Sequence, residues 1–416
     1  RSEWMAGRGG ETLMATVAEG SRQRIYLSPT ASQLAAACVD APAESVSGTM
    51  ADNPRWFSPP AYGLTRFEDL FTHRQLVALT TLGGLVDDAR DRALRDAMAA
   101  GMTEGRRLEE GGSDGAAYAD AMATYLGLVQ SKMTNLSSSI TTWMNDRAAF
   151  RETFARQALP MAWDFAEANV LSNGGGGWLT FLDKEVMVID HLPIGRANVT
   201  QADATVRPIS RLLISTDPPY YDNIGYSDLS DYFYVWLRRT LRSVHPGLFT
   251  TLLVPKEEEL VANPYRRGGK DAAKRFFEHG FRDFFARARS TARTDAPITV
   301  YYAFKQSDTT SDGTASSGWE TLLEGMIRSG WTVTGTWPLR SELGNRMRSL
   351  GSNALATSIV LALRPRTDGA STTDRRGFIA ALEAELPGAL RRLEQGQVAP
   401  VDLPQAAIGP GMAVFS

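Results

Sequence analysis

The chain has 416 residues, and its 44 Lys and Arg against 47 Asp and Glu give a formal net charge of −3. With 43% hydrophobic residues, including 17 Phe, 12 Tyr and 9 Trp, it can bury a large core, which excludes a mainly disordered polypeptide. No run of about 18 or more apolar residues occurs and no secretory signal opens the sequence, so we expect a cytoplasmic protein without a membrane-spanning helix.

Cysteine and histidine are scarce in the sequence. Cys38 is the single cysteine, which excludes an internal disulfide framework and a cysteine-based zinc cluster. The four histidines lie far apart, at His73, His191, His245 and His279. Because that spacing does not suit metal ligation, we expect a reduced protein with no metal site. The sequence opens on Arg1 rather than Met, so we also expect it to be a piece of a longer polypeptide.

The first part of the chain divides into an irregular N-terminal segment, residues 1–60, and a helical subdomain, residues 61–172. The irregular segment has glycine-rich turns and one strand candidate at residues 24–27. Apolar residues in the helical subdomain recur at steps of three and four, which is typical of amphipathic helices. The expected helices cover residues 73–100, 116–136 and 146–168. Asn173 and the glycines at 174–177 then end the helical block.

Residues 173–366 have a different sequence pattern, in which short runs of β-branched and aromatic residues alternate with helical patterns. The strand candidates are 212–216, 298–304, 331–337 and 357–363, and the helices between them are 229–241, 270–291 and 319–328. This alternation predicts an α/β fold with a mostly parallel sheet. No clear helix separates the last two strands, which favours an antiparallel hairpin at this point. Residues 367–416 are expected to form a tail with one helix at 375–393.

Charge is distributed unevenly along the chain. Residues 238–293 contain 13 Lys and Arg but 6 Asp and Glu, interleaved with aromatic side chains. One interpretation is an amphipathic helix with an aromatic core face and a solvated basic face. The other is a surface that neutralises phosphates beside a nucleic-acid site. The sequence leaves both interpretations open.

The most informative motif is Leu212–Tyr220, in which the apolar run LLIST leads directly into Asp217, Pro218, Pro219 and Tyr220. Ligands bind at the carboxyl ends of strands in open α/β sheets, so this tetrapeptide lies where a functional site is expected. The two prolines fix φ and lack an amide donor, so their carbonyls project from a rigid turn. Asp217 adds a carboxylate acceptor, and Tyr220 adds an aromatic face.

These groups suit the capture of an exocyclic amino group on a planar base. In adenine or cytosine the lone pair of that nitrogen is delocalised into the ring, which makes the nitrogen a poor nucleophile. If Asp217 and the Pro218 carbonyl accept its two N–H bonds, the lone pair is freed to attack an electrophilic methyl group held opposite. Tyr220 would stack on the base for about 1–3 kcal/mol and offset part of the cost of extruding it. The alternative is a rigid proline turn without function.

The motif resembles the Asp-Pro-Pro-Tyr motif of S-adenosylmethionine-dependent DNA amino-methyltransferases, and its leading aspartate resembles their adenine branch. The wider sequence is similar to large bacterial adenine-specific DNA methylases, some of which carry a zinc-ribbon insertion and occur with phage-defence genes. The resemblance includes Phe154–Met161, Asp217–Arg239 and a closing strand, Ser358–Arg366. It implies a partial Rossmann-like methyltransferase sheet with a terminal antiparallel hairpin, S-adenosyl-L-methionine as cofactor and DNA as partner.

These enzymes hold the methionine portion of the cofactor with a glycine-rich loop of the type Phe-x-Gly-x-Gly, which the sequence lacks. The glycines at 174–177 do not qualify, because no apolar strand leads into them and no clear helix is expected after them. In the resembled subgroup the loop lies upstream. The resemblance therefore implies a C-terminal portion whose partner is an upstream cofactor-binding half of the same polypeptide. Other defence-system proteins are further candidate partners.

Several residues outside the tetrapeptide are candidates for the same site. Asp203, shortly before the motif, is a candidate acceptor for the adenine amino group of the cofactor, and the resemblance implies that Asp217 also lies near the cofactor. The lip of the base pocket is expected to consist of Tyr221, Asn223 and Tyr226. Arg266 and Arg267 are candidates for contacts with DNA phosphates. An exposed loop aspartate and solvated loop arginines are the alternative interpretations.

The sequence thus predicts the catalytic segment of an adenine-N6 DNA methyltransferase. Two alternatives stay open. One is a nucleic-acid-binding defence component that keeps the base pocket but performs no chemistry, and the missing glycine-rich loop motivates it. The other is a methyltransferase that acts on cytosine N4 or on an RNA base.

Overall fold

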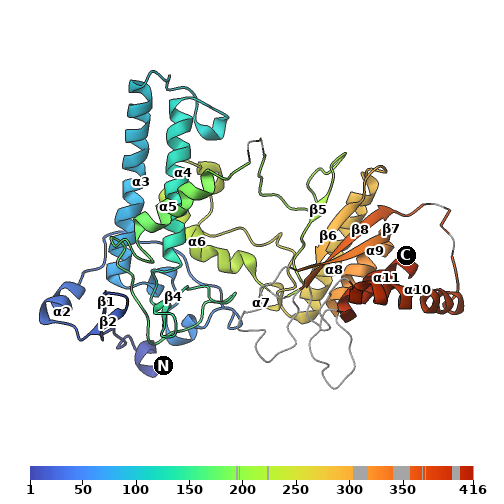
Figure 1. Cartoon of the computed structure of the whole chain (residues 1–416), viewed down its shortest axis with the longest axis horizontal. Coiled ribbons are helices and arrows are strands. Elements are labelled where there is room, and N and C mark those ends of the chain that lie inside the picture. Colours follow the sequence, from blue (N-terminus) through green and yellow to red (C-terminus); the bar gives the residue numbers. More distant parts are fainter. Residues whose placement is uncertain are drawn as a thin grey trace. The chain divides into compact units, whose positions relative to one another are not determined.

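The computed structural model describes residues 1–193, 195, 197–222, 224–302, 317–340, 357–367, 369–370, 372–395 and 403–415. The chain forms two compact units (Figure 1). The first comprises Arg1–Asn198 and Gly225–Glu257, and the second comprises Val199–Ile224 and Glu258–Ser416. These units do not coincide with the four segments expected from the sequence, because residues 225–257 belong with the helical part of the chain rather than with the sheet.

The first unit is built around long helices. They are α3 (His73–Ala99), α4 (Gly115–Thr134), α5 (Trp178–Ile189) and α6 (Tyr226–Leu241). The start of α3 is fixed by a capping box, in which the Gln75 amide donates to Thr72 Oγ1 at 3.1 Å and the Thr72 amide donates to Gln75 Oε1 at 2.9 Å. The helices predicted at 73–100 and 116–136 are confirmed.

Short elements make up the rest of the first unit. They are helices α1 (Ser2–Met5) and α2 (Ala31–Ala37), 3₁₀ helices at Pro59–Tyr62, Phe67–Leu70, Leu108–Glu110 and Pro246–Leu248, and strands β1 (Thr16–Glu19), β2 (Arg24–Leu27), β3 (Thr142–Met144) and β4 (Ala149–Arg151). The strands pair as two antiparallel hairpins, β1 with β2 and β3 with β4. The strand predicted at 24–27 is confirmed.

Two predictions for the first unit are wrong. The helix expected at 146–168 is absent, because Trp143 and Phe150 pair across the hairpin of β3 and β4 with their ring centroids 5.2 Å apart. A helix does follow the glycines at 174–177, since α5 starts directly after Gly177. The apolar residues of α5 are too closely spaced in the sequence to show a clear helical stripe. Phe181 is the buried side chain of this helix.

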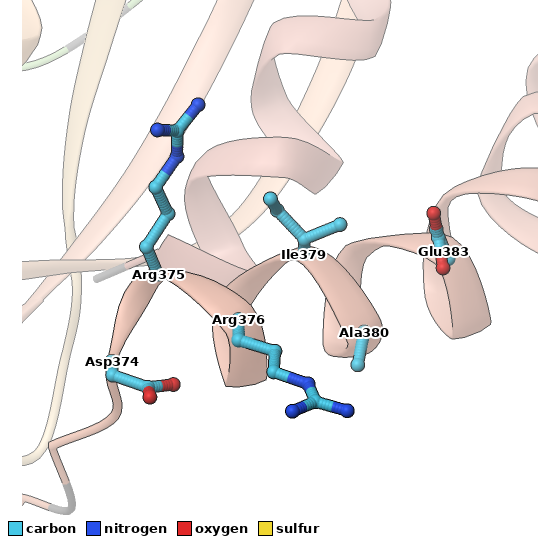
Figure 2. A pocket seen from close by; sticks show the side chains of 6 residues that line it. All are labelled: Asp374, Arg375, Arg376, Ile379, Ala380 and Glu383. Atoms are coloured by element: carbon cyan, nitrogen blue, oxygen red, sulfur yellow. The ribbon is translucent and has the colours of Figure 1, made fainter.

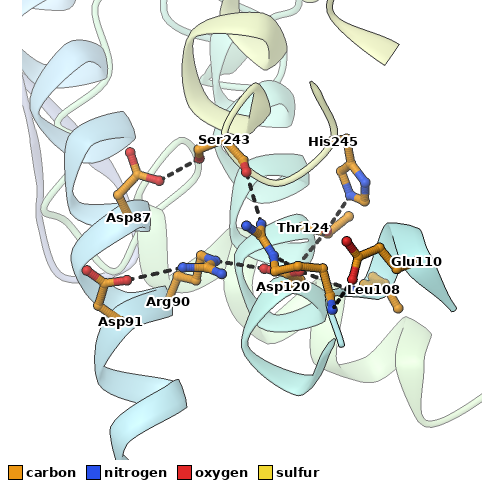
Figure 3. A network of polar contacts seen from close by, with 10 residues as sticks. Asp87, Arg90, Asp91, Leu108, Glu110, Asp120, Thr124, Ser243 and His245 are labelled. Carbon is orange, nitrogen blue, oxygen red and sulfur yellow. Dashed lines mark hydrogen bonds and ion pairs between the residues drawn. The ribbon is translucent and has the colours of Figure 1, made fainter. Parts of the chain in front are cut away.

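A network of charged side chains joins α3, α4 and the turn after α6 (Figure 3). The carboxylate of Asp120 on α4 is fully buried and accepts hydrogen bonds from Arg90 Nε at 2.7 Å, from Arg107 Nε at 2.6 Å and from the Leu108 amide at 3.1 Å. Arg107 also donates to the Ser243 carbonyl at 2.9 Å. A buried carboxylate with three donors is fully compensated, so the network ties the helices of this unit together.

The second unit contains a four-stranded sheet. Its strands, in spatial order, are β5 (Ser215–Thr216), β6 (Ile298–Tyr302), β8 (Thr357–Pro365) and β7 (Trp331–Arg340). β5 is parallel to β6, whereas β6 with β8 and β8 with β7 are antiparallel. The predicted α/β fold and its terminal hairpin are confirmed. The prediction of a mostly parallel sheet is wrong, because β8 returns between β6 and β7.

Helices cover this sheet. They are α7 (Pro264–Arg267), α8 (Lys270–Ser290), α9 (Ser317–Arg328), α10 (Arg375–Gln395) and α11 (Leu403–Phe415). α8 buries Phe277, Phe281 and Phe285 in the same core as Val300 and Leu361 of the sheet, while its lysines and most of its arginines stay exposed. The amphipathic interpretation of the basic stretch is therefore confirmed for α8. None of the helices described is both long and apolar enough to cross a membrane.

Candidate functional site

The strand that carries the motif is short. β5 spans two residues, whereas the sequence predicted a strand over 212–216. Within the described chain β5 pairs with one strand, β6, and the preceding Leu212 and Leu213 are 47% and 67% exposed. A backbone hydrogen bond from the Thr299 amide to the Ile214 carbonyl, 3.0 Å long, extends the pairing by one residue. A strand with a neighbour on one side loses half of its ladder bonds, which accounts for a strand that begins at Ser215 rather than at Leu212.

Asp217 and Pro218 follow directly after β5, at its carboxyl end. Because β6 runs parallel to β5, its last residue, Tyr302, lies at the same edge of the sheet. The Asp217 side chain is exposed and makes no hydrogen bond or ion pair with any part of the chain that the structure describes. Pro218 and Pro219 are half-buried, and their rings restrict φ at both positions. The carboxylate is thus available to an external donor.

Tyr220 is half-buried and packs edge-on against Tyr302, with the ring centroids 5.1 Å apart and an interplanar angle of 73°. Tyr302 is completely buried in the core of the second unit. Burial raises the pKa of the Tyr302 phenol far above its ordinary value, and Tyr220, Asp222 and Tyr221 add to this shift. Tyr302 is therefore a neutral, fixed ring beneath the motif.

Tyr221 anchors the loop after the motif. Its backbone has φ +57°, in the left-handed region that non-glycine residues rarely adopt. Its carbonyl accepts from the Ala262 amide at 3.0 Å, and its ring packs edge-on against Phe277 of α8 at 5.1 Å. Contacts on both backbone and ring hold this conformation. The ring of Tyr221, a predicted lip residue, thus packs on the protein core.

The other two predicted lip residues are Asn223 and Tyr226. Asn223 lies outside the described residues. Tyr226 is the first residue of α6 in the first unit and is 49% exposed. Within that unit α6 starts where Gly225 meets the ring of Trp56 so closely that a Cβ atom would lie 2.2 Å from it. This contact requires glycine at the start of α6.

Asp203 lies in a local turn of the second unit. Its Oδ1 accepts hydrogen bonds from the amide and the hydroxyl of Thr205, both at 2.8 Å, and its carbonyl accepts from the Arg207 amide at 2.9 Å. A side-chain turn of this kind accounts for an aspartate at this position without a cofactor. Its contact with a cofactor stays a prediction.

The two predicted phosphate-binding arginines lie in a helical turn, α7, rather than in an open loop. Arg266 Nη1 pairs with Glu259 Oε2 at 2.9 Å, and the two side chains are 11% and 15% exposed. The guanidinium of Arg267 lies 3.6 Å from the ring centroid of Phe276. Both side chains therefore contact the protein itself, and their contacts with DNA stay a prediction.

A depression along the first turns of α10 contains none of the predicted site residues (Figure 2). It is lined by Asp374, Arg375, Arg376, Ile379, Ala380 and Glu383. Arg375 and Arg376 extend in different directions, and Asp374 Oδ1 accepts from the Gly377 amide at 2.8 Å. Among the residues that the structure describes, no group of three or more His, Cys, Asp or Glu side chains is arranged to hold a metal ion.

No family model, curated protein or solved structure matches the chain. The edge of β5 and β6 presents an exposed carboxylate acceptor, a rigid proline pair and a half-buried tyrosine ring within four consecutive residues. The sequence identified these four residues by their order but missed Tyr302. The signal that could have found it is the parallel strand predicted over 298–304, whose carboxyl end shares the edge.

Proposed function

We propose that the chain is the catalytic segment of an S-adenosylmethionine-dependent methyltransferase that modifies the exocyclic N6 of adenine in DNA. One observation carries the proposal. Asp217 follows β5 at the carboxyl edge of the sheet, and its carboxylate is exposed without a partner in the described chain. An aspartate with a purely structural role is usually engaged by a neighbouring backbone amide, as Asp203 is by that of Thr205. An unengaged carboxylate at a sheet edge is instead suited to a ligand that donates hydrogen bonds.

The roles of the four motif residues follow from their chemistry. Asp217 and the Pro218 carbonyl accept the two N–H bonds of the amino group, which weakens the conjugation of its lone pair with the purine ring. Pro219 fixes the spacing between those acceptors and Tyr220, because its ring restricts φ. Tyr220 covers the face of the extruded base. When the nitrogen has gained a fourth bond, Asp217 is positioned to take the surplus proton and pass it to water.

The bound cofactor would supply an electrophilic methyl group. The described residues fit the amino-group side of such a reaction better than the cofactor side. Oδ1 of Asp203 is engaged by Thr205, and the glycines at 174–177, which precede α5, lie in the first unit, where no strand of the described chain leads directly into them. We therefore propose that a separate cofactor-binding half supplies the methionine-binding loop.

We further propose that the sheet is part of a Rossmann-like methyltransferase sheet. The order β5-β6-β8-β7, with one parallel pair followed by an antiparallel hairpin, is consistent with part of a Rossmann-like methyltransferase sheet. β5 has one strand neighbour within the described chain, and Leu212 and Leu213 next to it are exposed. Further strands on that side would bury them, as expected if a second half completes the sheet.

Methyl transfer tests the proposal. The native protein is incubated separately with DNA and with RNA in the presence of radiolabelled S-adenosylmethionine, and the methylated nucleosides are identified by mass spectrometry. We expect N6-methyladenine from the wild type and none above background from Asp217→Ala. Asp183→Ala, which changes an exposed aspartate on α5, is the matched control and should retain activity. Methylcytosine or a methylated RNA base would move the assignment to the corresponding acceptor.

A nucleic-acid-binding protein without methyltransferase activity is the second candidate. The missing glycine-rich loop and the exposed cations of α8, which include Lys274, Arg275 and Arg282, favour it. Isothermal titration of the native protein with S-adenosylmethionine separates the two. Measurable heat of binding supports the enzyme, whereas DNA binding without cofactor binding supports this second candidate.

A further inference from the structure

We propose that Tyr302 is a positioning residue that sets the ring of Tyr220 for stacking on the target base. This inference rests on the proposed function. The two residues come from chain segments more than 80 positions apart, and the parallel pairing of Thr216 with Val300 brings them to one edge of the sheet. Their rings meet edge to face, 5.1 Å apart at 73°. This geometry is the favourable one for two aromatic rings, and it defines the plane of each ring relative to the other.

The two partners differ in how firmly the fold holds them. Tyr302 is fully buried at the end of β6, which lies between β5 and β8, and its backbone pairs with Ile359. Tyr220 lies in irregular backbone and is half-buried. An aromatic ring on irregular backbone can adopt more than one χ1 rotamer, whereas a ring on a central strand cannot change rotamer without disturbing its neighbours. The fixed ring therefore constrains the orientation of the Tyr220 ring, which also packs against the surrounding core.

The consequence for the reaction is geometric. A base that stacks on a misplaced Tyr220 ring would hold its amino group away from Asp217, and small misplacements are costly in catalysis. Loss of an edge-to-face contact is expected to lower kcat about two- to tenfold. Because Tyr302 does not touch the base, the effect should be transmitted entirely through Tyr220.

A double-mutant cycle separates positioning from general stability. In the native protein, Tyr302→Leu should lower kcat about two- to tenfold, with the KM for S-adenosylmethionine unchanged. In a Tyr220→Ala background the same substitution should have no further effect on kcat, since the ring that it positions is gone. A merely structural role would give the same loss in both backgrounds, which overturns the inference.

Two matched variants complete the test. Tyr302→Phe keeps the ring and should retain kcat within about twofold, because the edge-to-face contact needs the ring rather than the hydroxyl. Tyr301→Leu removes a half-buried ring from the opposite face of β6 and should leave kcat unchanged. If Tyr301→Leu and Tyr302→Leu lower kcat equally, Tyr302 has no special role.

A spectroscopic measurement that does not depend on enzyme activity tests this inference separately from the proposed function. In protein labelled with 3-fluorotyrosine, the resonance that Tyr220→Phe removes identifies Tyr220. Tyr302→Leu should shift that resonance, whereas Tyr301→Leu should not. An unmoved resonance contradicts the positioning role even if the enzyme is active. A shifted resonance in a protein that never methylates nucleic acid supports the contact while it refutes the proposed function.

Discussion

Arg266 and Glu259 form an ion pair, 2.9 Å between Nη1 and Oε2, in which both side chains are largely shielded from water. The pair fixes the start of α7 against the segment that precedes it in the second unit. A shielded guanidinium with a carboxylate partner gains less from a phosphate than an exposed one does, because the existing pair must first be broken. We therefore expect Arg266 to contribute more to the stability of the protein than to phosphate binding.

We predict that Arg266→Ala destabilises the protein more than it weakens DNA binding. Removal of the arginine leaves Glu259 shielded and with one partner fewer, which should cost about 2–3 kcal/mol of unfolding free energy. Urea denaturation measures this loss. Arg275→Ala, which changes an exposed arginine on α8, is the matched control and should cost under about 0.5 kcal/mol. A variant of Arg266 with wild-type stability and a DNA affinity less sensitive to salt would assign Arg266 to phosphate binding after all.

The buried carboxylate of Asp120 is expected to dominate the stability of the first unit. Asp120→Asn keeps the shape of the side chain but removes the charge that compensates Arg90 and Arg107, which should cost about 3 kcal/mol. Asp91→Asn changes an exposed partner of the same Arg90 and should cost under about 0.5 kcal/mol. Equal unfolding midpoints for the two variants would contradict the role given to Asp120.

The same carboxylate makes stability depend on pH. Burial raises the pKa of Asp120, but hydrogen bonds from Arg107, Arg90 and the Leu108 amide outweigh burial, so its pKa lies below the ordinary value. A depressed folded-state pKa contributes stability that is present above the unfolded pKa, about 3.9, and is lost as pH falls through the folded pKa. Unfolding of wild type and Asp120→Asn between pH 6 and pH 3 should therefore converge towards the acid end. Parallel curves over that range would show that Asp120 does not titrate in this way.

Tyr220 should affect turnover through its aromatic face. Tyr220→Ala removes about 1–3 kcal/mol of stacking and should lower turnover by about one to two decades. Tyr220→Phe keeps the ring and should stay within a few-fold of wild type. Because the ring also contacts Tyr302, Tyr220→Ala should cost about 0.5–1.5 kcal/mol of stability beyond the loss of buried area. Alanine and phenylalanine variants with equal turnover would exclude stacking.

The elements with strong local patterns could be predicted from the sequence. α3 and α8 have apolar residues at helical spacing along their length, and the strands of the terminal hairpin are rich in β-branched residues. The segment 146–168 has a helical composition, but its first residues form the turn and second strand of a hairpin, because the ring of Trp143 packs on that of Phe150 across the strands. Such cross-strand pairing is a tertiary preference that overrides local propensity.

Some features of the candidate site could likewise be predicted from the local sequence, whereas others depend on tertiary contacts. Asp217 and Tyr220 could be predicted because they are adjacent in the sequence and follow an apolar run. The contact of Tyr220 with Tyr302 could not, since it depends on the register between β5 and β6. The pairing of Arg266 with Glu259 could not be predicted either, because the sequence does not fix which side chains meet across the irregular backbone before α7.

The most direct test of the proposed chemistry is methyl incorporation by Asp217→Asn, which keeps the size of the side chain but removes its charge. We predict that the variant folds like the wild type, because the Asp217 side chain is exposed and unengaged in the described chain, and that it loses at least about two decades of N6-adenine methylation. A folded Asp217→Asn protein that methylates adenine at the wild-type rate would contradict the account.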